Sequence, residues 1–120
     1  MKLIEVLKIL DAEFVSGVEW INREVVTVCG SDLMSDVLAF TSESTLLLTS
    51  LTNIQVIRTA EMSDLVGIVF VQGKRPGPDL IALASTNNIP LLVTPHSLYE
   101  SCGKLYQNGI KGCPKIGDVL

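Results

Sequence analysis

The sequence predicts one α/β domain with a mainly parallel sheet of four to five strands and helices on both faces. Two short runs, residues 67–73 and 89–94, are rich in aliphatic and β-branched residues and lack polar alternation, as strands buried on both faces do. Between them, Pro78 and Asp79 suit the first turn of a helix. A strand–helix–strand unit of this kind is a right-handed crossover. The length of 120 residues fits one core.

The composition excludes two classes of partner. The net charge is −4 and the basic residues are scattered, so the basic surface of a nucleic-acid-binding protein is missing. No apolar run reaches the roughly 18–20 residues of a membrane-spanning helix. The N-terminus carries Lys2, Glu5 and Lys8 and is too charged for a secretory signal, so we expect a cytoplasmic protein. The 48% hydrophobic content has two possible explanations: a sheet covered on both faces, or burial against a partner subunit in a homodimer.

The first half of the chain alternates helices and strands. Helical spacing of apolar residues predicts a helix over residues 2–10, and β-branched runs predict strands over 13–16, 22–29 and 45–49. Ser31 suits the N-cap of a helix over residues 32–40. Trp20, in a connection, is expected to cover the edge of the core, with ligand stacking as the alternative.

The second half continues this alternation. Residues 53–62 predict a helix, although Ile54, Val56 and Ile57 leave a strand open as an alternative. The last helix is expected to start at Thr94 and to end at residues 108–109. Its expected buried face is Leu98, Cys102, Leu105 and Tyr106. The domain would therefore cover residues 1–109, with residues 110–120 as a loose tail.

The candidate site lies in the loops that follow the strands. Open α/β sheets bind ligands beyond the carboxyl ends of their strands, and these loops offer hydroxyls, amides, helix N-termini and cations suited to a phosphate or carboxylate. No phosphate-binding motif is complete, and for Lys74 a solvated turn is the alternative. No metal or cofactor is indicated. The candidate ligand-binding residues are Gly30, Ser31, Asp32, Thr49, Thr52, Asn53, Gly73, Lys74, Thr94 and His96.

Catalysis would depend on His96 or Cys113. His96 is the only histidine and falls in the first turn of the expected last helix, with no nucleophile and orienting carboxylate near it in sequence. The other two cysteines, Cys29 and Cys102, are expected to be small apolar residues. Cys113 is flanked by lysines that favour a thiolate, so it is the one candidate for redox or metal chemistry, with an inert exposed thiol as the alternative.

Three stretches carry a resemblance to a known family: residues 30–37, 65–73 and 88–95. With the order of the elements, they make residues 1–109 similar to a DRTGG domain, here in stand-alone form. This family is similar in fold to the N-terminal domain of HPr kinase/phosphorylase and to those of some Mur ligases. Its members occur beside catalytic domains, between CBS domains, or alone. The chain has Thr52-Asn53 and Val71-Gln72-Gly73 where the family's Asp-Arg and Thr-Gly-Gly residues are expected.

The resemblance implies a regulatory role without catalysis. The expected protein is a dimer that senses a small anionic ligand, such as an adenine nucleotide, and acts on a partner enzyme. A ligand-free interaction or assembly protein is the alternative. A small redox or hydrolytic enzyme using Cys113 or His96 is the least favoured hypothesis.

Overall fold

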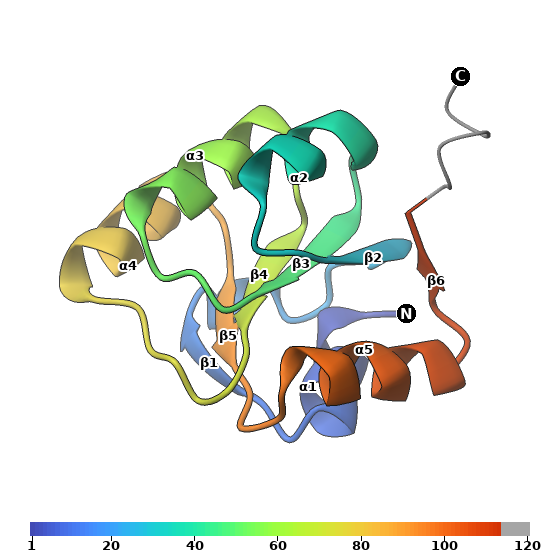
Figure 1. The fold of residues 1–120 in the computed structure, drawn as a ribbon. Helices are drawn as coiled ribbons and strands as arrows, with labels where there is room; N and C mark the ends of the chain where they lie inside the picture. Colours follow the sequence, from blue (N-terminus) through green and yellow to red (C-terminus); the bar gives the residue numbers. More distant parts are fainter. Residues whose placement is uncertain (114–120) are drawn as a thin grey trace.

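The computed structural model describes residues 1–113 and contains a six-stranded sheet in the order β1-β5-β4-β3-β2-β6 (Figure 1). Strands β2 to β6 are parallel, and β1 runs antiparallel to β5 at one edge. The strands are β1 Glu13–Ser16, β2 Thr27–Gly30, β3 Thr45–Thr49, β4 Gly67–Phe70, β5 Leu91–Val93 and β6 Lys111–Gly112. The helices are α1 Leu3–Ile9, η1 Val18–Trp20, α2 Met34–Phe40, α3 Ile54–Met62, α4 Pro78–Thr86 and α5 Leu98–Gln107. The predicted fold class is confirmed, with more strands than expected.

Helices cover both faces of the sheet, as predicted. Figure 1 shows α1 and α5 on one face and α2, α3 and α4 on the other. Strand β3 shows how the sequence supplies two cores. Because successive side chains of a strand point to opposite faces, Leu46 and Leu48 pack with α1 and α5, whereas Leu47 packs with α2 and α3. All three are fully buried.

The sixth strand lies in the segment that was expected to be a loose tail. Strand β6 pairs with β2, with Thr27 opposite Lys111 and Val28 opposite Gly112. Ile110, just before it, is buried in the core beside α5. The apolar side chain of Ile110 therefore brings the chain back to the sheet edge. The rest of the expected tail, residues 114–120, lies outside the described residues.

Residues 54–62 form a helix, so the predicted helix is confirmed and the alternative of a strand is excluded. Val56, Ile57 and Ala60 make a buried stripe that faces the sheet. Burial of this stripe at helical spacing outweighs the β-branched character of the segment. None of the helices within residues 1–113 has the length and apolar character to cross a membrane.

The strand expected over residues 22–29 is shorter than predicted and covers only Thr27–Gly30. Residues 23–25 instead form backbone hydrogen bonds with the N-terminal residues. The amide of Leu3 donates to the carbonyl of Arg23 at 3.0 Å, and the amide of Val25 donates to the carbonyl of Met1 at 2.6 Å. A long-range partner thus competes with the sheet for these backbone groups.

Two helices start later than predicted. Ser31 does not cap α2: its hydroxyl accepts from the amide of Leu33 at 3.1 Å, in a turn before the helix. Helix α5 is capped by Ser97, whose hydroxyl accepts from the amide of Glu100 at 3.2 Å, so Thr94 is not its cap. Tyr106, expected to be buried on α5, is 75% exposed.

Candidate functional site

The predicted loops gather along one edge of the sheet. The carboxyl ends of β2, β3, β4 and β5 are Gly30, Thr49, Phe70 and Val93, and the parallel pairing puts them on the same side. Because β1 is antiparallel, Glu13 at its start also lies at this edge, opposite Val93. We describe this carboxyl edge as two halves, one at β2 and β3 and the other at β4 and β5.

In the β2–β3 half, Asp32 joins two loops. Its carboxylate accepts hydrogen bonds from the hydroxyl of Thr49 at 2.8 Å, from the amide of Ser50 at 2.7 Å and from the hydroxyl of Ser50 at 2.6 Å. This is why Asp32 lies outside α2: its side chain reaches the end of the neighbouring strand instead of the start of its own helix. The sequence identified Asp32 and Thr49 but missed Ser50, which directly follows Thr49.

The surroundings of Asp32 favour its charged form. Partial burial acts to raise the pKa of Asp32, but the hydrogen bonds from Ser50 and Thr49, helped by the positive charge of Lys74, outweigh it and hold the pKa below its ordinary value. A carboxylate that stays ionised at neutral pH and a nearby lysine therefore occupy the middle of this half.

The other predicted residues of this half are exposed. Thr52 and Asn53 face solvent, and so does Lys74, which comes from the loop after β4 but acts on Asp32 in this half. Asn53 is the N-cap residue of α3, yet its side chain makes no capping hydrogen bond. The first-turn amides of α3 therefore have no side-chain acceptor at the cap, and the helix start keeps its affinity for negative charge.

In the β4–β5 half, the loop that follows β4 is tied to the loop that follows β5. Gln72 and Gly73 both have positive φ, 58° and 65°, and form a tight turn. Their amides donate at 2.8 Å to the carbonyl oxygens of His96 and Thr94. The Gly73 loop is thus a turn whose amides already have partners.

Thr94 and His96 extend this bonded network. The fully buried hydroxyl of Thr94 donates to the carbonyl of Leu10 at 2.6 Å and accepts from the amide of His96 at 3.3 Å. His96 Nε2 lies 3.0 Å from Asp11 Oδ2. His96 precedes α5 and is not in its first turn. The sequence missed Asp11 because 85 residues separate it from His96.

The structure thus brings together only part of the predicted set. Asp32, Thr49 and Lys74 form one group, and Gly73, Thr94 and His96 form another. His96 follows β5, whereas Cys113 follows β6 at the far edge, so β4, β3 and β2 separate them. Within residues 1–113, no three side chains of His, Cys, Asp or Glu are grouped to hold a metal.

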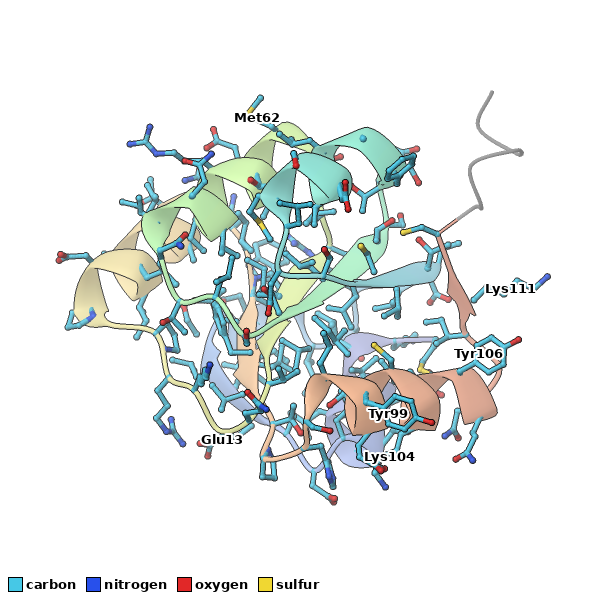
Figure 2. The ribbon with its side chains drawn as sticks, in the orientation of Figure 1. Glu13, Met62, Tyr99, Lys104, Tyr106 and Lys111 are labelled. Atoms are coloured by element: carbon cyan, nitrogen blue, oxygen red, sulfur yellow. The ribbon has the colours of Figure 1, made fainter. Side chains whose placement is uncertain are left out.

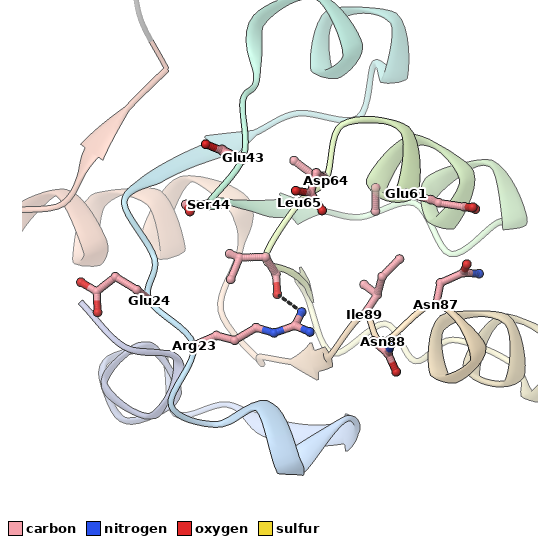
Figure 3. Close-up of a pocket in the computed structure, with 12 residues that line it drawn as sticks. Arg23, Glu24, Glu43, Ser44, Glu61, Asp64, Leu65, Asn87, Asn88 and Ile89 are labelled. Atoms are coloured by element: carbon pink, nitrogen blue, oxygen red, sulfur yellow. Dashed lines mark hydrogen bonds between the residues drawn. The ribbon is translucent and has the colours of Figure 1, made fainter.

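A cavity of about 510 Å³ lies at the opposite, amino edge of the sheet (Figure 3). Arg23 reaches into it, donates to the carbonyl of Val66 at 3.3 Å and packs over Trp20, with its guanidinium 4.2 Å from the ring centroid. Trp20 is half-buried beneath Arg23, and its expected role as a cover of the core edge stays a prediction. Burial lowers the pKa of Arg23, against the opposing effect of Asp64. The acidic residues of the wall are Glu24, Glu43, Glu61 and Asp64.

This cavity was not predicted from the sequence. Its wall comes from four separate segments of the chain, so no local sequence pattern predicts it. Because carboxylates outnumber the one arginine, and the arginine is already bonded, the cavity disfavours phosphate groups. The carboxyl edge of the sheet is the more favourable place for an anionic ligand to bind.

The architecture defines the chain as an open, mainly parallel α/β domain with its polar loops at the carboxyl edge. The family model of the DRTGG domain matches residues 5–107, so the chain belongs to the DRTGG domain family. The sequence resemblance is confirmed.

The fold is also found in a solved structure. It is similar, with a TM-score of 0.70 and 20% identity, to the crystal structure of the CBS and DRTGG domains of the regulatory region of Clostridium perfringens pyrophosphatase, complexed with the activator diadenosine tetraphosphate. The match covers 88% of this chain and 46% of that chain, so the protein spans about half of that fragment. A comparison with curated protein sequences gives no match.

Proposed function

We propose that this protein is a cytoplasmic, non-catalytic regulatory module that senses a small anionic ligand, such as an adenine nucleotide, and acts as a homodimer on a partner enzyme. The observation that carries the proposal is the β2–β3 half of the carboxyl edge. There Lys74, the hydroxyl of Thr52 and the start of α3 face solvent around a fixed carboxylate. Family membership and the nucleotide activator of the structurally similar regulatory region support it.

The electrostatics set the expected strength of binding. Lys74 and the first-turn amides of α3 attract a phosphate group. Asp32 repels it, although three hydrogen bonds and Lys74 offset part of this charge. These opposing effects favour a weak site, as suits a sensor that must release its ligand when the concentration falls.

Titration calorimetry with AMP, ATP and diadenosine tetraphosphate tests the ligand. We expect heat with at least one of them, and about tenfold weaker binding in Lys74→Ala, which corresponds to about 1.4 kcal/mol. Lys8→Ala, which removes an exposed lysine on α1, is the matched control and should bind as the unchanged chain does. No heat with any of the three nucleotides would refute nucleotide sensing.

The dimer is supported by apolar side chains that remain exposed. Figure 2 shows Met62 on α3 and Tyr99 and Tyr106 on α5 projecting from the surface, where they are 73%, 84% and 75% exposed. Tyr99 and Tyr106 are seven residues apart, so they lie on the same side of α5, where they can form one apolar contact surface. Light scattering coupled to size-exclusion chromatography should give the mass of a dimer, and a monodisperse monomer would contradict it.

A ligand-free interaction or assembly protein is the second candidate. The observation that favours it is the position of Asp32, whose negative charge stands where a phosphate would have to bind. In this case the dimer forms and the calorimetric titrations stay flat. The two measurements together therefore separate the two functions.

A further inference from the structure

Two cysteines lie side by side at the edge of the sheet. Cys29 is on β2, and Cys113 directly follows β6. The parallel register pairs Thr27 with Lys111 and Val28 with Gly112, and continuing it by one residue would set Cys29 opposite Cys113. Neighbouring strands are about 4.8 Å apart, and disulfides join residues whose Cα atoms are about 4.4–6.8 Å apart. The backbone therefore has the spacing that a disulfide needs.

The side chains support the same pairing. Cys113 Sγ lies 3.9 Å from the carbonyl oxygen of Val28, the residue before Cys29, and, in addition to burial, Cys113 is close enough to Cys29 to raise the pKa of its thiol. Cys29 packs on the α2–α4 side of the sheet, whereas Cys102 packs with α1 and α5 on the other face. Among the three thiols, Cys29 and Cys113 are thus the pair positioned to join.

We propose that Cys29 and Cys113 form a reversible intramolecular disulfide that fixes β6 on the edge of β2. Strand β6 has two residues, both exposed, and within residues 1–113 it pairs with β2 alone. Such a short edge strand opens more readily than the centre of a sheet. A covalent bond one residue beyond β6 would hold the strand in place. This inference does not depend on the proposed ligand.

Opening of β6 changes what the chain exposes. A cavity of about 180 Å³ lies between β2, β6 and α5, and its wall includes Val28, Leu105 and Ile110. These three side chains are buried when β6 is paired. The disulfide would keep them covered, and its reduction would allow this apolar edge to open. The redox state of the thiol pair would therefore control whether β6 stays paired with β2.

The oxidant we propose is a low-molecular-weight disulfide such as oxidised glutathione. Burial, and next the neighbouring Cys113, raise the pKa of Cys29 to about 12, so Cys29 is a poor first nucleophile. Cys113 attacks the oxidant and forms a mixed disulfide, releasing one glutathione. Cys29 then loses its proton to solvent and attacks the sulfur of Cys113, releasing the second glutathione. Two thiols are oxidised and one glutathione disulfide is reduced.

Thiol counting in glutathione buffers of increasing oxidised fraction tests the proposal. The full chain is alkylated, digested and analysed by mass spectrometry. We expect the loss of two of the three reactive thiols, without bound glutathione, and one cross-linked peptide pair containing Cys29 and Cys113. Tryptic cleavage after Lys111 should be lost in the oxidised form and return on reduction.

Two variants separate this pair from other thiol chemistry. Cys102→Ala should keep both the cross-link and the protection of Lys111. Cys113→Ala, changed outside the two cores, should keep the fold, as judged by circular dichroism, and lose both. Three free thiols in every buffer, glutathione adducts without a cross-link, a bond to Cys102, or a covalent dimer would each overturn the proposal.

Discussion

Both halves of the carboxyl edge have polar residues after buried strands, but they differ in what these polar groups contact. In the β4–β5 half, the hydroxyl of Thr94 and the amides of Gln72 and Gly73 bond to backbone carbonyls of other segments. In the β2–β3 half, the hydrogen bonds converge on the one carboxylate of Asp32, and Lys74 stays exposed.

Burial divides the polar groups of this edge into two kinds. Thr94 and Thr49 are fully buried, and a buried polar group must be satisfied within the protein, so the hydroxyl of Thr94 bonds to Leu10 and that of Thr49 to Asp32. Thr52, Asn53 and Lys74 can instead be satisfied by water and remain available to a ligand. A polar residue after a strand therefore becomes part of the framework or part of a surface site according to its exposure.

The largest expected effect concerns the β4–β5 half. Thr94→Val keeps the shape of the side chain and removes the hydroxyl, which leaves the buried carbonyl of Leu10 without this donor. We expect the free energy of unfolding to fall by about 1–3 kcal/mol, measured by urea denaturation.

The matched variant in the other half is Thr52→Val. Because Thr52 is exposed, its free energy of unfolding should stay within about 0.5 kcal/mol of the unchanged chain. Equal destabilisation by Thr94→Val and Thr52→Val would remove the distinction between the two halves.

The next largest effect concerns the tight turn in the β4–β5 half. Gly73 has a φ of 65°, and open space surrounds the position that a Cβ would take. Gly73→Ala should therefore destabilise the fold through backbone strain alone, by about 1 kcal/mol. Gly103→Ala is the control, because Gly103 also has open space around it but lies inside α5, where alanine is not strained. Thermal unfolding should show a lower midpoint for the first variant only, and two equal midpoints would contradict the strained turn.

The central part of the fold was predictable from the sequence because it depends on local patterns. Strands β3 and β4, the start of α4 at Pro78 and the helical stripe of α1 all follow from spacing and residue type. Strand β6 was missed because two residues, Lys111 and Gly112, carry no strand signal of their own and depend on β2 for pairing.

The candidate site was predictable only as a list of loops. The expected ends of the parallel strands were enough to place Asp32, Thr49 and Lys74 at one edge of the sheet. The sequence did not indicate that Thr94 would be buried or that Asp11 would pair with His96, since both depend on contacts across more than 80 residues. Long-range partners decide whether a polar side chain is structural, and sequence spacing does not reveal them.

The smallest expected effect concerns Asp32 and depends on pH. Its pKa is below the ordinary value of 3.8 in the folded protein, so its ionised form stabilises the fold above that value, and this contribution is lost as the pH falls through the folded-state pKa. Asp32→Asn should lower the free energy of unfolding at neutral pH by at most about 1 kcal/mol, since the carboxylate is largely exposed to solvent. The difference should disappear in acid, once the pH has fallen below the folded-state pKa of Asp32.

Urea denaturation across this pH range measures the effect, with Glu43→Gln as the control. Glu43 is exposed and has no hydrogen-bond partner among residues 1–113, so its variant removes a charge without removing a hydrogen bond. A difference between the unchanged chain and Asp32→Asn that is constant from neutral pH to acid would mean that the charge of Asp32 does not hold the two loops together. The β2–β3 half would then depend on the shape of its turns, as the β4–β5 half does.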